Sequence, residues 1–252
     1  MHTTNLLLSS LLSALTLAAP TSTMPPASTN TATPVTNTTV NGQADNLALI
    51  QKLIFAPKAV DRITLIPNDR DFVFDFNNPP SDTLTTGKGG HTVRADRQSF
   101  PPLIGTGVSM TLGFLGPCGF NTPHIHPRSS EINVVVKGSL VAEFTLENGA
   151  RTVTNAVDTN QMMVFPQGAL HTEFNPDCTE ALFVAGFASE DPGVQQEAQT
   201  FFGFGTEAVE AAVGNGFTFE GGDVDKFRAA IPANVALGVE TCLKKCNIAR
   251  NK

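Results

Sequence analysis

The sequence contains neither tryptophan nor tyrosine, and only 16 of its 252 residues are lysine or arginine. Without a basic cluster to neutralise a phosphate backbone, nucleic acid is not an expected partner. A lectin that stacks sugars on aromatic rings would be unusual without tryptophan and tyrosine. Beyond residue 19, no segment approaches the roughly 20 consecutive apolar residues that a membrane-spanning helix needs. These absences exclude nucleic-acid binding and membrane insertion as first hypotheses.

The residues that are present describe an acidic globular protein. Hydrophobic residues make up 41% of the chain, 18 residues are phenylalanine, and the formal net charge is −7. So many apolar side chains argue against disorder of the whole chain. The length suits one large domain or two small ones with a sizeable core.

Charged side chains are missing from the N-terminal region, where the first is Asp45. The apolar run of residues 6–19 ends in two alanines, as the hydrophobic and cleavage regions of a secretory signal do. Only His2 and the terminal amine can supply positive charge before this run. We predict a signal peptide over residues 1–19 and therefore a secreted protein, extracellular or attached to the cell wall.

Residues 20–44 are rich in serine, threonine and proline, and none of them is charged. Such a composition cannot bury enough apolar surface to fold, so we predict a disordered arm that is a candidate for O-glycosylation. Asn37 lies in this arm and begins the chain's single N-glycosylation sequon, Asn-Thr-Thr.

Three regions follow the arm. Apolar residues at helical spacing predict a helix within residues 45–66, with Asp45 as its N-cap and Pro57 as a breaker. Residues 71–187 alternate in the manner of strands, and Asn148-Gly149 is typical of a hairpin turn. The alternating or β-branched runs are Phe72 to Phe76, Ile132 to Val136 and Val141 to Leu146. Many short strands without intervening helices indicate an all-β sandwich or barrel.

The composition changes to alanine, glutamate, glutamine and lysine from Pro192 onward. We predict helices at Val194–Phe202, Glu207–Val213 and Val224–Ala230, with another after Pro232. The expected organisation is a β domain with an N-terminal extension over residues 45–190, followed by a helical extension over residues 191–252.

Three of the five histidines fall into two spaced motifs within the β region. His124 and His126 are two residues apart, so a strand would place both imidazoles on one face. Glu131 follows five residues later, and His171 lies beyond the turn Pro166-Gln167-Gly168. Three imidazoles and a carboxylate suit a divalent first-row metal and leave up to two coordination positions open, as catalytic sites do.

These motifs resemble those of the cupin superfamily, in particular the germin-like proteins and the spherulins. The first motif reads GFNTPHIHPRSSE over residues 119–131 and closes at Gly138, and the second reads PQGALH over residues 166–171 with Asn175 beyond it. Two departures are Cys118 and Asn160, which stand where these motifs usually open with glycine.

The resemblance implies an all-β jelly-roll barrel that binds manganese through His124, His126, Glu131 and His171, although the same ligands accept other first-row divalent metals. It also implies a glycosylated homo-oligomer, trimeric or hexameric, whose C-terminal helices help to hold subunits together.

Four cysteines in a secreted chain suggest two disulfides, for which three pairings exist. If the strands of His124 and His171 are antiparallel neighbours, Cys118 and Cys178 lie at the same end of the sheet. We therefore predict the bridges Cys118–Cys178 and Cys242–Cys246.

The resemblance offers two enzymatic activities on small molecules, superoxide dismutation and oxalate oxidation. Asn121 matches a residue that can hydrogen-bond a bound substrate. Oxalate-oxidising germins place a second asparagine after a Val-Ser-Met triplet, whereas Val108-Ser109-Met110 is followed here by Thr111. This difference favours a manganese-dependent, superoxide dismutase-like oxidoreductase over an oxalate oxidase. The competing hypothesis is a non-enzymatic, metal-stabilised stress or cell-wall protein similar to spherulins.

Overall fold

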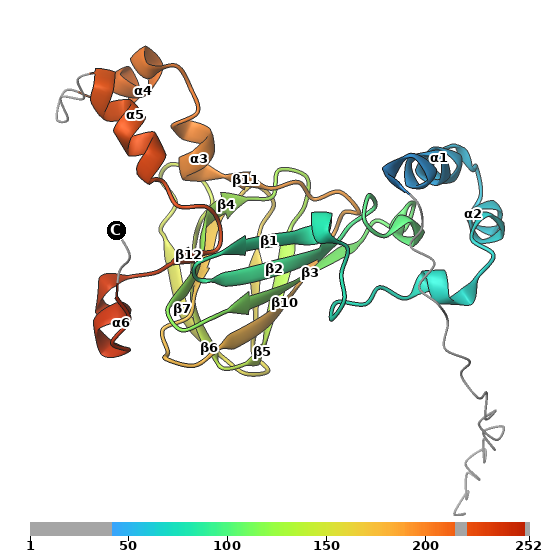
Figure 1. Ribbon diagram of the computed structural model, residues 1–252, viewed down its shortest axis with the longest axis horizontal. Coiled ribbons are helices and arrows are strands. Elements are labelled where there is room, and N and C mark those ends of the chain that lie inside the picture. The colour runs from blue at the N-terminus through green and yellow to red at the C-terminus, as the bar shows by residue number, and fades with distance from the viewer. Residues whose placement is uncertain (1–41, 215–220, 250–252) are drawn as a thin grey trace, which may run out of the picture. The chain divides into compact units, whose positions relative to one another are not determined.

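The computed structural model describes residues 42–214 and 221–249, with side chains described over 46–214 and 226–249 (Figure 1). The predicted signal peptide, Asn37 and all of the predicted arm except its last three residues lie outside the described residues. Among the helices of the described ranges, none is long and apolar enough to cross a membrane.

Two antiparallel sheets form the body of the fold, as the sequence pattern predicts (Figure 1). The first sheet has the order β1-β2-β3-β10-β5-β8, and the second has the order β11-β4-β9-β6-β7 with β12 paired to β4. The first consists of β1 (Leu84–Gly87), β2 (Gly90–Ala95), β3 (Ser109–Leu115), β10 (Ala181–Phe187), β5 (Glu131–Lys137) and β8 (Met162–Phe165). The second consists of β11 (Gln195–Gln196), β4 (Gly119–Ile125), β9 (Leu170–Phe174), β6 (Ser139–Thr145), β7 (Val153–Asp158) and β12 (Ala236–Leu237).

The hydrophobic core consists of side chains at every second position along the strands, which point inward. Along β10, for example, Ala181, Phe183, Ala185 and Phe187 are buried, whereas the residues between them are only partly so. A fully buried side chain of the size of valine, leucine or phenylalanine contributes roughly 1.5–3 kcal/mol through its removal from water. The core side chains include Leu115, Val135, Leu140, Phe165 and Phe183.

Turns between strands match the sequence predictions at two glycines. Gly149 and Gly168 both have positive φ, 92° and 77°, in the turns that precede β7 and β9. Cys118 and Asn160, which stand where the resembling motifs have glycine, also adopt left-handed φ values of 56° and 67°. Asparagine tolerates this conformation better than most residues. These two positions therefore keep the turn geometry without the glycine.

The N-terminal extension is helical and its first helix ends just before Pro57, as predicted, but the start of that helix differs from the prediction. Helices α1 (Gly42–Phe55) and α2 (Ala59–Leu65) form, and Leu53 is buried with Ile66 and Ile104. The helix begins at Gly42, so Asp45 is not its N-cap and the predicted arm does not extend through residue 44.

The prediction of a strand through Phe72, Phe74 and Phe76 is wrong. A 3₁₀ helix (Asp69–Phe72) precedes a loop, two more lie at Ser81–Thr83 and Pro101–Leu103, and the first strand begins at Leu84. The ring of Phe74 packs edge-to-face on both Phe76 and Phe100, at centroid distances of 4.7 and 5.6 Å. The alternation therefore reflects the packing of rings in a loop and not a pleated strand.

The C-terminal region contains α3 (Glu197–Phe201), α4 (Thr206–Val213), α5 (Gly221–Ala230) and α6 (Glu240–Lys245). The predicted helix at 194–202 starts later than expected because Gln195 and Gln196 pair with Ile125 and His124 of β4 as strand β11. The helices lie outside the two sheets in Figure 1.

The predicted disulfide pairing is wrong. The bridges are Cys118–Cys242 and Cys178–Cys246, with Cα–Cα distances of 5.7 and 5.3 Å. Cβ atoms four residues apart on a helix are about 5–6 Å apart, whereas a disulfide requires roughly 3.5–4.5 Å. Helix α6 instead lies at the end of the barrel where Cys118 and Cys178 meet, so each of its cysteines bonds to one of them.

Candidate metal centre

Neighbouring strands bring the candidate ligands together. Strands β4 and β9 are antiparallel, and His124 lies directly opposite His171 in their register. His126 follows at the end of β4, and Glu131 begins β5 in the other sheet. All four side chains point into the barrel and are buried.

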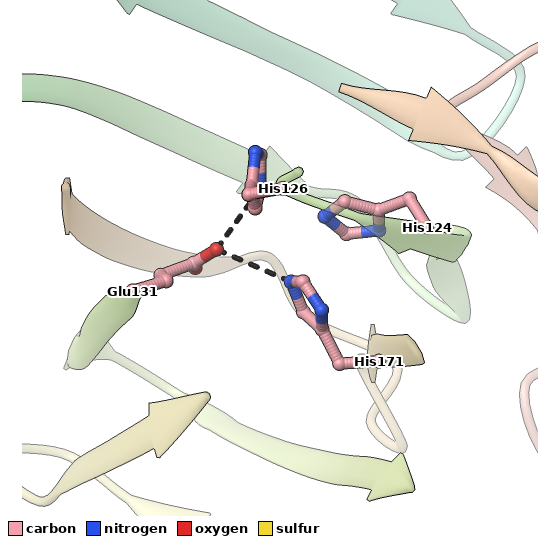
Figure 2. Close-up of side chains that lie close together, drawn as sticks. All are labelled: His124, His126, Glu131 and His171. Carbon is pink, nitrogen blue, oxygen red and sulfur yellow. Dashed lines mark hydrogen bonds and ion pairs between the residues drawn. The ribbon is translucent and has the colours of Figure 1, made fainter. Parts of the chain in front are cut away.

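The four ligand atoms form a compact cluster, shown in Figure 2, in which all lie within 4.8 Å of one another. The Oε2 atom of Glu131 is 3.1 Å from Nε2 of His126 and 3.2 Å from Nε2 of His171. His124 completes the group from the side of β4 (Figure 2). Imidazole and carboxylate donors in this number are those that a first-row divalent cation prefers.

The three imidazoles are oriented by backbone carbonyl groups. The Nδ1 atoms of His124 and His171 lie 2.9 and 2.8 Å from the carbonyl oxygens of Thr122 and Ala169. The Nδ1 atom of His126 lies 2.5 Å from the carbonyl oxygen of Gly193. A carbonyl oxygen only accepts, so each Nδ1 is the protonated donor, and metal-binding histidines are typically held by such bonds. Each ring therefore turns Nε2 toward the cluster, and this donor set fits a metal ion.

Burial and mutual proximity set the protonation of the cluster. Burial, with the charges of His171 and His126, lowers the pKa of His124 to about 3, so its ring is neutral at pH 7. Although burial alone would raise the pKa of Glu131, hydrogen bonds from His126 and His171 lower it to about 2. A neutral imidazole and an ionised carboxylate are the forms that bind metals, and His124 and Glu131 hold them. Although burial lowers the pKa of His171, the hydrogen bond to Glu131 and the charge of Glu173 raise it, so a metal that binds here displaces the proton from Nε2 of His171.

Asn121, the candidate substrate contact, reaches the same interior because β4 is irregular. Residues 121 and 124 are an odd number apart and would face opposite sides of a regular strand. The β4–β9 register shifts between Asn121 and His124, a bulge that includes Pro123. Both side chains are consequently buried inside the barrel.

A second buried carboxylate, Glu173, lies beside the ligands and was not predicted from the sequence. Its Oε2 accepts a hydrogen bond from Asn121 Nδ2 at 2.8 Å, and its Oε1 accepts one from Asn133 Nδ2 at 3.1 Å. Burial and the charge of Glu131 raise the pKa of Glu173 to about 7. The alternation that pairs His124 with His126 also places Glu173 with His171 and Asn133 with Glu131, so the signal was present in the sequence.

A cavity of about 650 Å³ leads to the cluster. Its wall is partly polar, and it includes residues from both sheets and from the C-terminal region. Examples are Thr92, Thr111, Asn121, Gln196 and Asn234. A small molecule can therefore approach the ligands from this side.

Comparison with known proteins bears on this arrangement. Residues 74–225 match the family described as Cupin. The chain belongs to the cupin family. It is 42% identical to Spherulin-1A of Physarum polycephalum over 198 residues, which cover 79% of this cupin and 78% of that protein. It is 34% identical to oxalate oxidase 1 of Hordeum vulgare over 135 residues, which cover 53% and 67% of the two chains.

Solved structures extend the likeness to the fold. A recombinant oxalate oxidase in complex with glycolate superposes with a TM-score of 0.58 at 29% identity, covering 67% of this cupin and 84% of that chain. The cupin family and the germin-like and spherulin resemblance are thus confirmed together with the all-β fold.

Proposed function

We propose that this cupin is a secreted manganese-binding protein that acts as an extracellular oxidoreductase on reactive oxygen, with superoxide as the substrate. The observation that carries the proposal is the cluster of His124, His126, Glu131 and His171, buried and preoriented beside a cavity. Manganese bound there would supply the electron transfer by cycling between its +2 and +3 states. The protein's own backbone carbonyls turn Nε2 of each imidazole toward the cluster, and the lowered pKa values of His124 and Glu131 keep these two ligands in their metal-binding forms. The cavity leaves access from one side.

Three features of the cavity disfavour oxalate as the substrate. The Asn121 amide is already engaged, because Nδ2 donates to Glu173 and Oδ1 accepts from Asn234 at 2.7 Å. Thr111, which follows the Val-Ser-Met triplet, lies in the cavity wall. The carboxyl group of Glu173 would repel a dicarboxylate whenever it is ionised.

A second candidate function is a non-enzymatic protein of the stress response or cell wall, in which the metal stabilises the fold. The similarity to Spherulin-1A and to Spherulin-1B, the latter at 41% identity over 201 residues, favours it. The uncharged residues 20–44 would suit attachment to a wall. This candidate predicts a large fall in melting temperature on demetallation and no turnover of superoxide or oxalate.

Elemental analysis of the purified protein, with superoxide and oxalate assays on the same sample, tests both candidates. Manganese near one per chain with superoxide turnover supports the enzyme. Manganese without turnover of either substrate supports the structural candidate. Zinc, or no metal in a folded sample, contradicts the manganese proposal.

Secretion is part of the proposal and is supported by the two disulfides, since such bonds persist in oxidising compartments. Mass spectrometry of the protein from culture medium would test it, because a secreted chain should lack residues 1–19 and carry glycan on Asn37. Recovery of the intact, unmodified chain from inside the cell would contradict it.

We also propose self-association through the outer face of the first sheet. In strands β3, β5, β8 and β10 the charged residues are Glu131, which points inward, and Lys137 at a strand end. The exposed apolar side chains on this face include Met110, Ile132, Val136, Met162 and Val164, each between 40% and 62% exposed. Apolar patches of this kind mark interaction sites.

Light scattering of the secreted protein tests this assembly. Val164→Lys should reduce the measured mass toward that of one chain, because it places a charge in the apolar face. Leu146→Lys, in the turn between β6 and β7, is the matched control and should leave the mass unchanged. A wild-type protein that is monomeric throughout would contradict the proposal.

A further inference from the structure

The segment from residue 232 to residue 238, here called the C-terminal strap, lies against β4, the strand that carries His124 and ends next to His126. Ala236 and Leu237 pair with Phe120 and Gly119 of β4. The Gly238 N–H donates to the carbonyl of Cys118 at 2.7 Å. The strap is thus built into the edge of the second sheet, although it lies more than 100 residues from β4 in the sequence.

The carboxamide of Asn234, within the strap, uses both of its ends on β4. Its Oδ1 accepts from the backbone N–H of Thr122 at 2.9 Å, and its Nδ2 donates to Oδ1 of Asn121 at 2.7 Å. Both contacts fall at the bulge, where the β4–β9 register shifts. Because a bulge leaves a residue without its ladder partner, Asn234 satisfies a backbone N–H that the sheet does not.

Two hydrogen-bonded routes lead from Asn234 to the ligands. The shorter one passes through Thr122, whose own carbonyl accepts from Nδ1 of His124 at 2.9 Å. Asn234 therefore holds the residue that orients this imidazole.

The longer route crosses the barrel. Asn121 donates to Glu173, and Nδ2 of Asn133 lies between the two carboxylates, 3.1 Å from Oε1 of Glu173 and 3.2 Å from Oε1 of Glu131. Asn121, Asn133, Glu131 and Glu173 are all buried. In a low-dielectric interior such a network of hydrogen bonds is rigid, and the loss of one side chain leaves buried polar groups unpaired. These hydrogen bonds connect Asn234 with the carboxylate of Glu131 on the far side of the metal centre.

From these contacts we infer that Asn234 is a positioning residue of the metal centre, which fixes the His124 ring through Thr122 and the Glu131 carboxylate through Asn121, Glu173 and Asn133. The inference rests on the proposed metal binding. It assigns to the C-terminal strap a role in the coordination geometry in addition to covering the barrel.

The disulfides explain how a short strap can hold this position. Cys242 of α6 is bonded to Cys118, next to the start of β4, and Cys246 is bonded to Cys178. Val235 and Ala236 are buried as well. The strap is therefore held covalently beyond its C-terminal end and by packing along its length, which limits the positions open to Asn234.

The test compares manganese binding by the full-length secreted protein and its Asn234→Ala variant, using a competing chelator for the affinity and electron paramagnetic resonance of bound Mn²⁺ for the coordination geometry. Loss of an outer contact of this kind typically weakens metal affinity 10- to 100-fold. We expect a loss of about tenfold or more for Asn234→Ala, with a changed resonance spectrum.

Two further variants make the test specific. Lys245→Ala removes contacts of α6 with Pro176 and Asp177, at 3.2 and 3.1 Å, and is the control for loosening the C-terminal end away from the centre. It should leave affinity and spectrum unchanged. Asn234→Asp keeps the acceptor for Thr122 but loses the donor to Asn121, so it should change the spectrum with a smaller loss of affinity. If Asn234→Ala does not fold, the Asn234→Asp variant alone tests the inference.

The outcomes separate the inference from the proposed function. Wild-type affinity and an unchanged spectrum in Asn234→Ala and Asn234→Asp would overturn the inference and leave metal binding intact. Equal losses in Asn234→Ala and Lys245→Ala would also overturn it, because a general loosening would then account for the effect. A folded wild-type protein that binds no manganese would overturn both.

Discussion

The Nδ1 atom of His126 lies 2.5 Å from the carbonyl oxygen of Gly193, a residue 67 positions further along the chain. The loop that presents this carbonyl is held by Asp191, whose carboxylate accepts from Arg128 at 2.6 Å and from Arg97 at 3.0 Å. Exposed ion pairs contribute little to stability by themselves, but here they fix a loop that orients a candidate ligand.

Gly193→Ala should therefore weaken metal binding. Gly193 has a φ of 68°, and a Cβ there would lie 2.8 Å from Nη2 of Arg128, so the guanidinium that pairs with Asp191 must shift. Left-handed strain of this kind costs about 1–3 kcal/mol. A chelator-competition titration should show reduced manganese affinity. Gly149→Ala, with a φ of 92° and no atom within 4 Å of the added Cβ, is the control for strain alone. Equal affinities in both variants would contradict the expected role of the loop.

Removal of a ligand should abolish metal binding. In His124→Ala or His171→Ala, three donors remain and a buried partner loses its contact, so we expect metal content near zero by elemental analysis. His91→Ala is the matched control, since this imidazole stacks on Phe114 at 4.5 Å and is not part of the cluster. Full manganese occupancy in either ligand variant would exclude the centre described above.

The disulfide pairing can be checked directly. Peptide mapping without reduction should recover a peptide pair containing Cys118 with Cys242 and another containing Cys178 with Cys246. These bonds join residues 124 and 68 positions apart. Closing loops of that length stabilises a protein by about 4–5 kcal/mol in the chain-entropy treatment. Denaturant unfolding of Cys118→Ser/Cys242→Ser should show a loss of about that size, and an unchanged midpoint would argue against the bond.

The carboxyl group of Asp177 should make the free energy of unfolding fall more steeply as the pH is lowered into the acid range. Hydrogen bonds from Ser139 and Lys245 lower the pKa of this carboxyl below its ordinary value of 3.8. A lowered folded-state pKa stabilises the protein above the unfolded-state value, and the contribution is lost as pH falls through the folded-state pKa. Thermal melting should therefore show Asp177→Asn less stable than wild type near neutral pH.

The same comparison at low pH tests the sign. As the pH falls through the lowered folded-state pKa of Asp177, the wild-type and Asp177→Asn melting temperatures should converge, because both side chains are then uncharged. Asp82→Asn, at an exposed aspartate, is the control. A difference between Asp177→Asn and wild type that persisted unchanged into acid would show that charge is not the cause.

Alternation along single strands made much of the interior predictable. His124 and His126 were placed on one face by a spacing of two, and the same rule applied to β5 and β9 would have identified Asn133 and Glu173. The spacing of three between Asn121 and His124 was not interpretable in this way, because a bulge in β4 brings both inward. Bulges depend on the partner strand, which a local pattern does not reveal.

Other predictions were wrong because local pattern was outweighed by distant contacts. Phe72 ends a 3₁₀ helix, and Phe74 packs on Phe76 and Phe100 in the loop that follows. The cysteines of α6 bond to Cys118 and Cys178 because that helix lies at their end of the barrel.

The sequence by itself determined the all-β class, the cupin motifs and the four candidate ligands, since period-two alternation and motif spacing are local properties. Only the tertiary structure decided the cysteine pairing, the carbonyl of Gly193 on His126 and the amide of Asn234 on β4. Each of these joins residues more than 60 positions apart. Such contacts depend on how irregular segments cross the barrel, and no periodicity encodes that path.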